Sequence, residues 1–290
     1  MAKVHELLAA GRTLSFEFWP PRDRARFDRT LDALAPMAPD FVSVTYGAAG
    51  STREGTHDLV VDLSHMDALL PVAHLCCAAH RRADLVETLT RYRAEGIDNV
   101  LALRGDPPLD HDGALAEGDL RYAAELVEVV RSVGDFSVGV AAHPEGHPDS
   151  RGAREIDLDH AAAKLKVADY AITQFFFRVE DYLRLVDGLE ERGVDRPVIP
   201  GIMPIDRIGQ VARMAEMAGT TFPPELTDRL DGARHDPDEV RRIGIDVATE
   251  LGQKLLAEDV PGLHFYTMNR AASVSAVCAN LGLGPEMAAR

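Results

Sequence analysis

The chain has 290 residues, 46% of them hydrophobic, and a formal net charge of −16. The charge argues against nucleic acid or an anionic membrane as a partner, because no basic block is present to neutralise phosphates. No apolar stretch approaches the ~20 residues of a membrane span, and the three cysteines fit neither a disulfide framework nor a zinc cluster. We therefore expect a cytoplasmic protein with a small-molecule partner, and homo-oligomer formation is compatible with the sequence.

Eight short apolar runs predict β-strands, with amphipathic segments between them. The predicted strands are Leu14–Phe18, Phe41–Thr45, Val72–Cys76, Asn99–Leu103, Ser137–Ala141, Tyr170–Gln174, Val198–Gly201 and Gly262–Tyr266. The predicted helices include Arg24–Leu34, Arg82–Ala94, Leu120–Arg131, Asp181–Glu191 and Val240–Ala257.

This alternation predicts an α/β fold, a (β/α)8 TIM barrel whose site opens at the carboxyl ends of the strands. No linker divides the chain, so we expect one domain over residues 1–290. Short helical pieces between Pro204 and Asp238 predict extra helices there rather than a second domain.

The fourth predicted strand ends abruptly in charged residues. Arg104, Gly105 and Asp106 follow its apolar run, and Pro107-Pro108 prevent the strand from continuing. Charge at the end of a buried parallel strand is typical of a ligand site. The alternative is an Arg–Asp pair that ties down a turn.

The first predicted strand carries a candidate general acid. Its apolar residues alternate with Ser15 and Glu17, so Glu17 should point towards the barrel axis. Partial burial favours the protonated carboxyl that a proton donor needs, whereas a buried ion pair is the structural alternative. The following Trp19-Pro20-Pro21 is either a rigid apolar wall of the site or an aromatic plug of the core.

Polar residues also end other strands. A glycine-rich turn after Thr45 could present N–H groups to an anion, and His74 could point inward. His143 and His147 lie in a stiff proline-containing loop after the fifth strand. This loop could form a metal site, an acid–base site or a ligand clamp, so a metal-dependent hydrolase using His74, His143 and His147 is an alternative function.

Four further candidate residues follow from spacing and from place along the chain. Asp157 and Lys164 are seven residues apart and share one helix face, which could also be a solvated ion-paired face. The amide of Gln174 could read the edge of a pterin or pyrimidine ring. Arg270, at the mouth after the last strand, could pair with a carboxylated substrate.

Together, seven motifs in order resemble the methylenetetrahydrofolate reductase family over nearly the whole chain. They are Ser15–Pro21, Phe41–Ala48, Ala102–Pro108, Pro144–Pro148, Ala171–Phe177, Pro200–Pro204 and His264–Arg270. The resemblance implies a flavoenzyme of one-carbon metabolism and methionine biosynthesis. Such an enzyme uses FAD and NADH to reduce 5,10-methylenetetrahydrofolate to 5-methyltetrahydrofolate.

The resemblance also assigns residues. Glu17 matches the general acid, and Asp106 matches a carboxylate beside flavin and pterin that stabilises the folate iminium ion. Folate-contacting positions correspond to Gln174, Gln210 and Arg270. Flavin-binding positions correspond to Thr45, Tyr46, Ala48, His74, Arg104, Gly105, Asp106, Tyr122, Ala123, His143, His147, Asp157 and Lys164.

Four positions depart from the family pattern. His143 replaces a tyrosine, His160 and Ala163 replace polar or basic residues, and Met214 replaces a phenylalanine. Loss of such stacking and charged contacts predicts weaker flavin binding, to the point that NADH transfers hydride directly to the folate. The folate chemistry itself is expected to be retained. A noncatalytic folate-binding barrel, in which Glu17 would be dispensable, is the third alternative.

Overall fold

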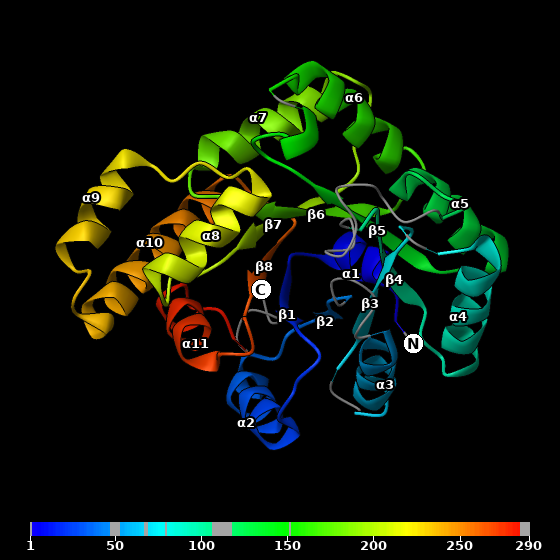
Figure 1. Ribbon diagram of the computed structural model, residues 1–290, viewed down its shortest axis with the longest axis horizontal. Coiled ribbons are helices and arrows are strands. Elements are labelled where there is room, and N and C mark those ends of the chain that lie inside the picture. Colours follow the sequence, from blue (N-terminus) through cyan, green and yellow to red (C-terminus); the bar gives the residue numbers. More distant parts are fainter. Residues whose placement is uncertain are drawn as a thin grey trace.

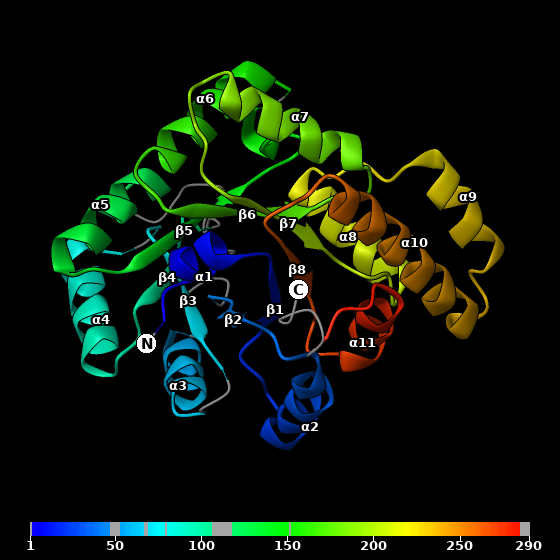
Figure 2. The same ribbon diagram turned by 180° about the vertical axis from the view of Figure 1, so that it is seen from behind.

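The computed structural model describes residues 2–46, 53–66, 69–78, 80–105, 118–150 and 152–284. Its centre is a closed barrel of eight parallel strands in sequence order, surrounded by helices (Figures 1 and 2). The strands are β1 (Thr13–Phe18), β2 (Phe41–Val44), β3 (Pro71–Cys76), β4 (Asn99–Leu103), β5 (Ser137–Ala142), β6 (Tyr170–Phe175), β7 (Val198–Ile202) and β8 (Gly262–Tyr266). The predicted (β/α)8 TIM barrel is confirmed, and each strand end lies within about one residue of its predicted position.

The helices extend the simple alternation. They are α1 (Val4–Ala10), α2 (Arg24–Leu34), α3 (Arg53–Ser64), α4 (Arg82–Ala94), α5 (Ala123–Val133), α6 (Arg154–Leu165), α7 (Val179–Glu190), α8 (Ile208–Ala218), α9 (Pro224–Gly232), α10 (Pro237–Ala257) and α11 (Ala271–Asn280). Short 3-10 helices cover Ala35–Met37 and Pro148–Ser150. The extra helices expected between Pro204 and Asp238 are α8 and α9.

Helix α1 covers the amino-terminal end of the barrel (Figure 2). The Val4 N–H donates to Asn99 Oδ1 at the start of β4 (2.9 Å), and the His5 N–H donates to Ser137 Oγ at the start of β5 (3.1 Å). The carboxyl ends of the strands lie at the opposite end of the barrel and remain available for a site.

The barrel interior is filled with large side chains, including those of Phe41, Leu101, Tyr170 and Ile199. Tyr170 fits because its neighbour across the β5–β6 ladder is Gly139, where an added Cβ would lie 2.5 Å from the ring. A second apolar layer joins the outer faces of the strands to the helices. Within the described part of the chain, no helix combines the length and apolarity that crossing a bilayer requires.

Candidate active site

A cavity of about 1340 Å³ opens at the carboxyl ends of the strands and brings most of the predicted residues together. Those lining it are Glu17, Thr45, Tyr46, His74, Arg104, Gly105, Tyr122, Ala123, His143, His147, Asp157, Lys164 and Gln174. They come from strands and loops around the barrel, as expected for the single site of this fold.

Four predicted residues are not among the described residues that line the cavity. Ala48 and Asp106 lie outside the described residues. Gln210 is half-buried on α8 and is not among the described residues that line the cavity. The same holds for Arg270, which precedes α11 and has its Nη1 3.7 Å from Asp206 Oδ2.

Glu17 lies between two buried histidines in a group that we call the acid corner, comprising Ser15, Glu17, His74 and His264. Glu17 Oε2 is 3.6 Å from His74 Nε2 and 3.8 Å from His264 Nε2. His264 Nδ1 lies 2.8 Å from Ser15 Oγ, which fixes the ring from its far side. The carboxyl is 8% exposed, and its only ion-pair neighbours within 4.0 Å among the described residues are these imidazoles.

All four residues of the acid corner are buried. Burial lowers the pKa of His74 to about 4, against the opposing effect of Glu17, so this imidazole is neutral near pH 7. Both Nε2 atoms lack a hydrogen-bond partner in the described structure. Burial, with Glu17 nearby, raises the pKa of Tyr266 well above its usual value, and the Tyr266 hydroxyl donates to the Thr173 carbonyl (2.7 Å). Among the described residues, no lysine or arginine lies at ion-pair distance from Glu17, whose close partners are these two imidazoles.

Trp19 follows Glu17 by two residues and is exposed. It lines the cavity and keeps 41% of its surface accessible. The alternative of an aromatic core plug is therefore wrong, and the apolar-wall interpretation is the one the structure supports.

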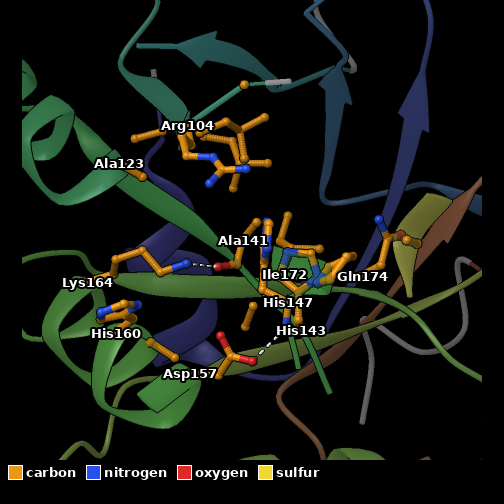
Figure 3. Close-up of a pocket in the computed structure, with 18 of the residues that line it drawn as sticks. Arg104, Ala123, Ala141, His143, His147, Asp157, His160, Lys164, Ile172 and Gln174 are labelled. Carbon is orange, nitrogen blue, oxygen red and sulfur yellow. Dashed lines mark hydrogen bonds between the residues drawn. The ribbon is translucent and has the colours of Figure 1, made fainter. Parts of the chain in front are cut away.

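A second group, which we call the polar wall, comprises Arg104, His143, His147, Asp157 and Lys164 (Figure 3). Lys164 Nζ donates to the Ala141 carbonyl (2.7 Å), and Asp157 accepts from the His147 N–H (2.7 Å) and from the Ser150 hydroxyl. Both helix residues thus face the cavity, and the solvated-face alternative for Asp157 and Lys164 is wrong.

One glycine allows this loop to close on Asp157. Gly146 has a φ of 96°, and an added Cβ would lie 2.8 Å from Asp157 Oδ2. A residue with a side chain there would be strained and would collide with the carboxylate that holds the loop.

Burial tunes the charges of the polar wall. It lowers the pKa of Lys164 to about 8; Asp157 opposes this shift and Arg104 adds to it. It lowers the pKa of His143 to about 3, with further contributions from His147, Lys164 and Arg104. His143 is therefore neutral, and its buried Nδ1 has no hydrogen-bond partner within the described residues.

These residues fit a dinucleotide such as FAD. A guanidinium and an ammonium suit a diphosphate, a neutral imidazole with an open nitrogen can bond a ring or ribose, and the cavity exceeds the 300–1,000 Å³ typical of small-molecule sites. A metal fits less well, because no three His, Cys, Asp or Glu side chains among the described residues are grouped as metal ligands. The metal-hydrolase alternative is not supported.

Sequence reasoning missed His264. The alternation of residues along β8 could have identified it. Leu263 and Phe265 face the helices, so His264 and Tyr266 occupy the alternate, inward positions. The cross-strand register pairs Ser15 with His264 and Glu17 with Tyr266, so the position of His264 follows once the barrel is closed.

Comparisons with known proteins agree with this geometry. The family model described as methylenetetrahydrofolate reductase matches residues 3–282. The chain is 38% identical to 5,10-methylenetetrahydrofolate reductase of Pectobacterium carotovorum, over 95% of this chain and 92% of the relative. It is 37% identical to the Escherichia coli protein of the same name, over 94% of this chain and 91% of the relative.

A plant relative and a solved structure extend the comparison. Methylenetetrahydrofolate reductase (NADH) 1 of Arabidopsis thaliana is 36% identical over 97% of this chain and 50% of its own length. A Clostridium thermocellum protein, described as binding two copies of 5-methyl-5,6,7,8-tetrahydrofolic acid, has a TM-score of 0.61 at 12% identity. The alignment covers 96% of this chain and 97% of that protein. At 12% identity, it shows only that the two proteins share a fold. From the family model and the bacterial relatives, the chain belongs to the methylenetetrahydrofolate reductase family.

Proposed function

We propose that this protein reduces 5,10-methylenetetrahydrofolate to 5-methyltetrahydrofolate with hydride from a nicotinamide cofactor. The observation that carries the proposal is one cavity with an acid, Glu17, on β1 and a diphosphate-compatible polar wall around β4–β6. Membership of the reductase family supports the same reaction. It also favours catalysis over the noncatalytic folate-binding barrel, since the relatives are named as reductases.

The proposed role of Glu17 follows from the bond that must break. The product keeps the one-carbon unit on N5, so the bond from that carbon to N10 is cleaved and N10 needs a proton. Glu17, beside the neutral His74, supplies this proton, and the carbon becomes an iminium ion that accepts hydride. Asp106, which follows the cavity-lining Gly105, would stabilise the cation.

The polar wall would hold the dinucleotide. Arg104 and Lys164 suit its diphosphate, while His143 offers a neutral nitrogen. Bound FAD supplies hydride transfer between a nicotinamide cofactor and the folate carbon. The replacements at His143, His160, Ala163 and Met214 support weaker flavin retention. In protein without flavin, the polar wall would hold the diphosphate of NADH, our proposed reductant, for direct hydride transfer to the folate.

Two measurements test the proposal. NADH oxidation by purified protein should require methylenetetrahydrofolate and yield 5-methyltetrahydrofolate; oxidation that ignores the folate would reject the function. The visible spectrum, recorded before and after dialysis, should show flavin below one equivalent. Stoichiometric yellow flavin that survives dialysis would reject weakened flavin binding while leaving the reductase proposal intact.

We also propose a cytoplasmic location, as Cys77 and Cys278, which form no disulfide among the described residues, suit a reducing compartment. Fractionation with an antibody to the native protein tests this, and recovery with an oxidising compartment would reject it.

A further inference from the structure

Trp19 is an exposed aromatic residue beside a buried acid. It follows Glu17 by two residues, just beyond the end of β1 at Phe18. Glu17 is 8% exposed, whereas Trp19 is 41% exposed and lines the same cavity. The rim of the site therefore presents an indole next to the proton donor.

The backbone of Trp19 is clamped by a polar side chain. Its N–H donates to Asn269 Oδ1 (2.9 Å), and Asn269 Nδ2 donates to the Trp19 carbonyl (2.8 Å). Asn269 and Met268 both have left-handed backbones, with φ of 53° and 52°. Non-glycine residues rarely adopt this conformation, and such strain is concentrated at functional sites. Packing in the core does not hold the indole in place; this clamp fixes the backbone that carries it.

The cavity that Trp19 lines also carries apolar side chains that suit an aryl ring. Among them are the methionines Met268, which precedes Asn269 in its turn, and Met217 on α8. Met217 is 66% exposed. Thioether and aromatic groups pack well against aryl rings. The polar wall comes from β4 to α6, across the barrel from β1 and β8. A ligand ring that packed on Trp19 would therefore lie on the Glu17 side of the cavity, across the barrel from the polar wall.

The substrate has such a ring at the required place. In the proposed reaction Glu17 protonates N10, and N10 is bonded directly to the aminobenzoyl ring of the folate. Resting on that proposed function, we propose that Trp19 is a substrate-binding residue whose indole stacks on the aminobenzoyl ring. The Asn269 clamp positions the indole for this contact.

Trp19 is the single tryptophan of the chain, so its fluorescence reports directly on this contact. We expect p-aminobenzoylglutamate and 5-methyltetrahydrofolate each to shift the emission and to shield Trp19 from acrylamide. ADP-ribose should do neither. Shielding by ADP-ribose but not by p-aminobenzoylglutamate would overturn the assignment in favour of the dinucleotide.

Kinetics give an independent test. Trp19→Leu should raise KM for methylenetetrahydrofolate about tenfold, as expected for loss of one aromatic stack, with KM for NADH unchanged. Trp19→Phe should recover most of the loss because it keeps a ring. Asn269→Ala should reproduce part of the effect. Val86→Ala serves as the control, since Val86 is 37% exposed on α4 and is not among the described cavity residues.

The two proposals fail in different ways. If wild-type protein reduces folate while Trp19 is neither shielded nor needed for a low KM, the stacking assignment is wrong and the function stands. If wild-type protein shows no folate-dependent NADH oxidation, the function and the assignment both fall. Should Trp19→Leu not fold, the wild-type shielding measurement and Trp19→Phe decide the question.

Discussion

The acid corner and the polar wall face the same cavity but are built on different physical principles. The acid corner joins strand residues about 250 positions apart through the β1–β8 register, and its histidines are buried with Nε2 atoms unpartnered in the described structure. The polar wall uses loop and helix residues whose charged groups bond to main-chain atoms. The corner is suited to hold one proton on a buried carboxyl, whereas the wall is suited to hold an anion. Removing a residue should therefore impair turnover in the first case and dinucleotide affinity in the second.

The largest effect should follow from Glu17→Gln. It keeps the shape of the side chain but removes the proton donor, so folate reduction should fall by roughly 10²- to 10⁴-fold. Single-turnover kinetics with preformed complexes would measure this. Glu145→Gln is a matched control, because Glu145 bonds the Thr221 N–H and is not among the described cavity residues. Equal rates for Glu17→Gln and wild type would reject the acid assignment.

Lys164→Met should come next and should act on binding. Loss of a charged contact to the diphosphate is expected to weaken NADH binding about 10- to 100-fold, since such hydrogen bonds contribute ~1.5–3 kcal/mol. Calorimetric titration would measure it, with Lys166→Met, at an exposed position, as control. An unchanged dissociation constant would remove Lys164 from the binding site.

The effect of pH on NADH affinity should be smaller than that of Lys164→Met. It is set by Lys164, whose pKa is lowered to about 8. The ammonium binds the diphosphate below this pKa and is lost above it, so NADH affinity should decline several-fold between about pH 7 and 9. His74 and His143, with pKa values lowered to about 4 and about 3, are neutral throughout this range. Titrations should show the decline in wild type, and a flat profile in Lys164→Met; a decline of equal size in both would exclude Lys164 as its cause.

The smallest change should come from Asp157→Asn. The amide can still accept from the His147 N–H, but the charge that raises the pKa of Lys164 is gone. The midpoint of the affinity decline should therefore move below about pH 8, as the same titration series would show. A shift upward would contradict the electrostatic arrangement of the wall.

Most of the fold could be predicted because buried parallel strands are short apolar runs and the helices between them are amphipathic. Helix α1 was not predicted, and α3 and α11 were implied only by the (β/α)8 pattern. α1 has seven residues and depends on hydrogen bonds to Asn99 and Ser137, which no local pattern reveals.

In the candidate site, too, residues with a local sequence signal could be predicted and those that depend on long-range contacts could not. Glu17 followed from strand alternation, and most polar-wall residues followed from strand ends and the family resemblance. His264 and the exposure of Trp19 depend on contacts between β1 and β8, at opposite ends of the chain. The placement of Arg270 beside Asp206 likewise depends on the α11 turn. These contacts join residues far apart in the sequence and form only when the barrel closes, so no local sequence pattern indicates them.

The most direct test of the division between corner and wall is a crossed measurement of turnover and NADH dissociation constant in Glu17→Gln and Lys164→Met. Glu17→Gln should lose turnover and bind NADH like wild type, while the deficit of Lys164→Met should be overcome by saturating NADH. If Glu17→Gln weakened NADH binding as much as Lys164→Met, or if saturating NADH failed to restore Lys164→Met, the two regions would not have the separate roles assigned to them.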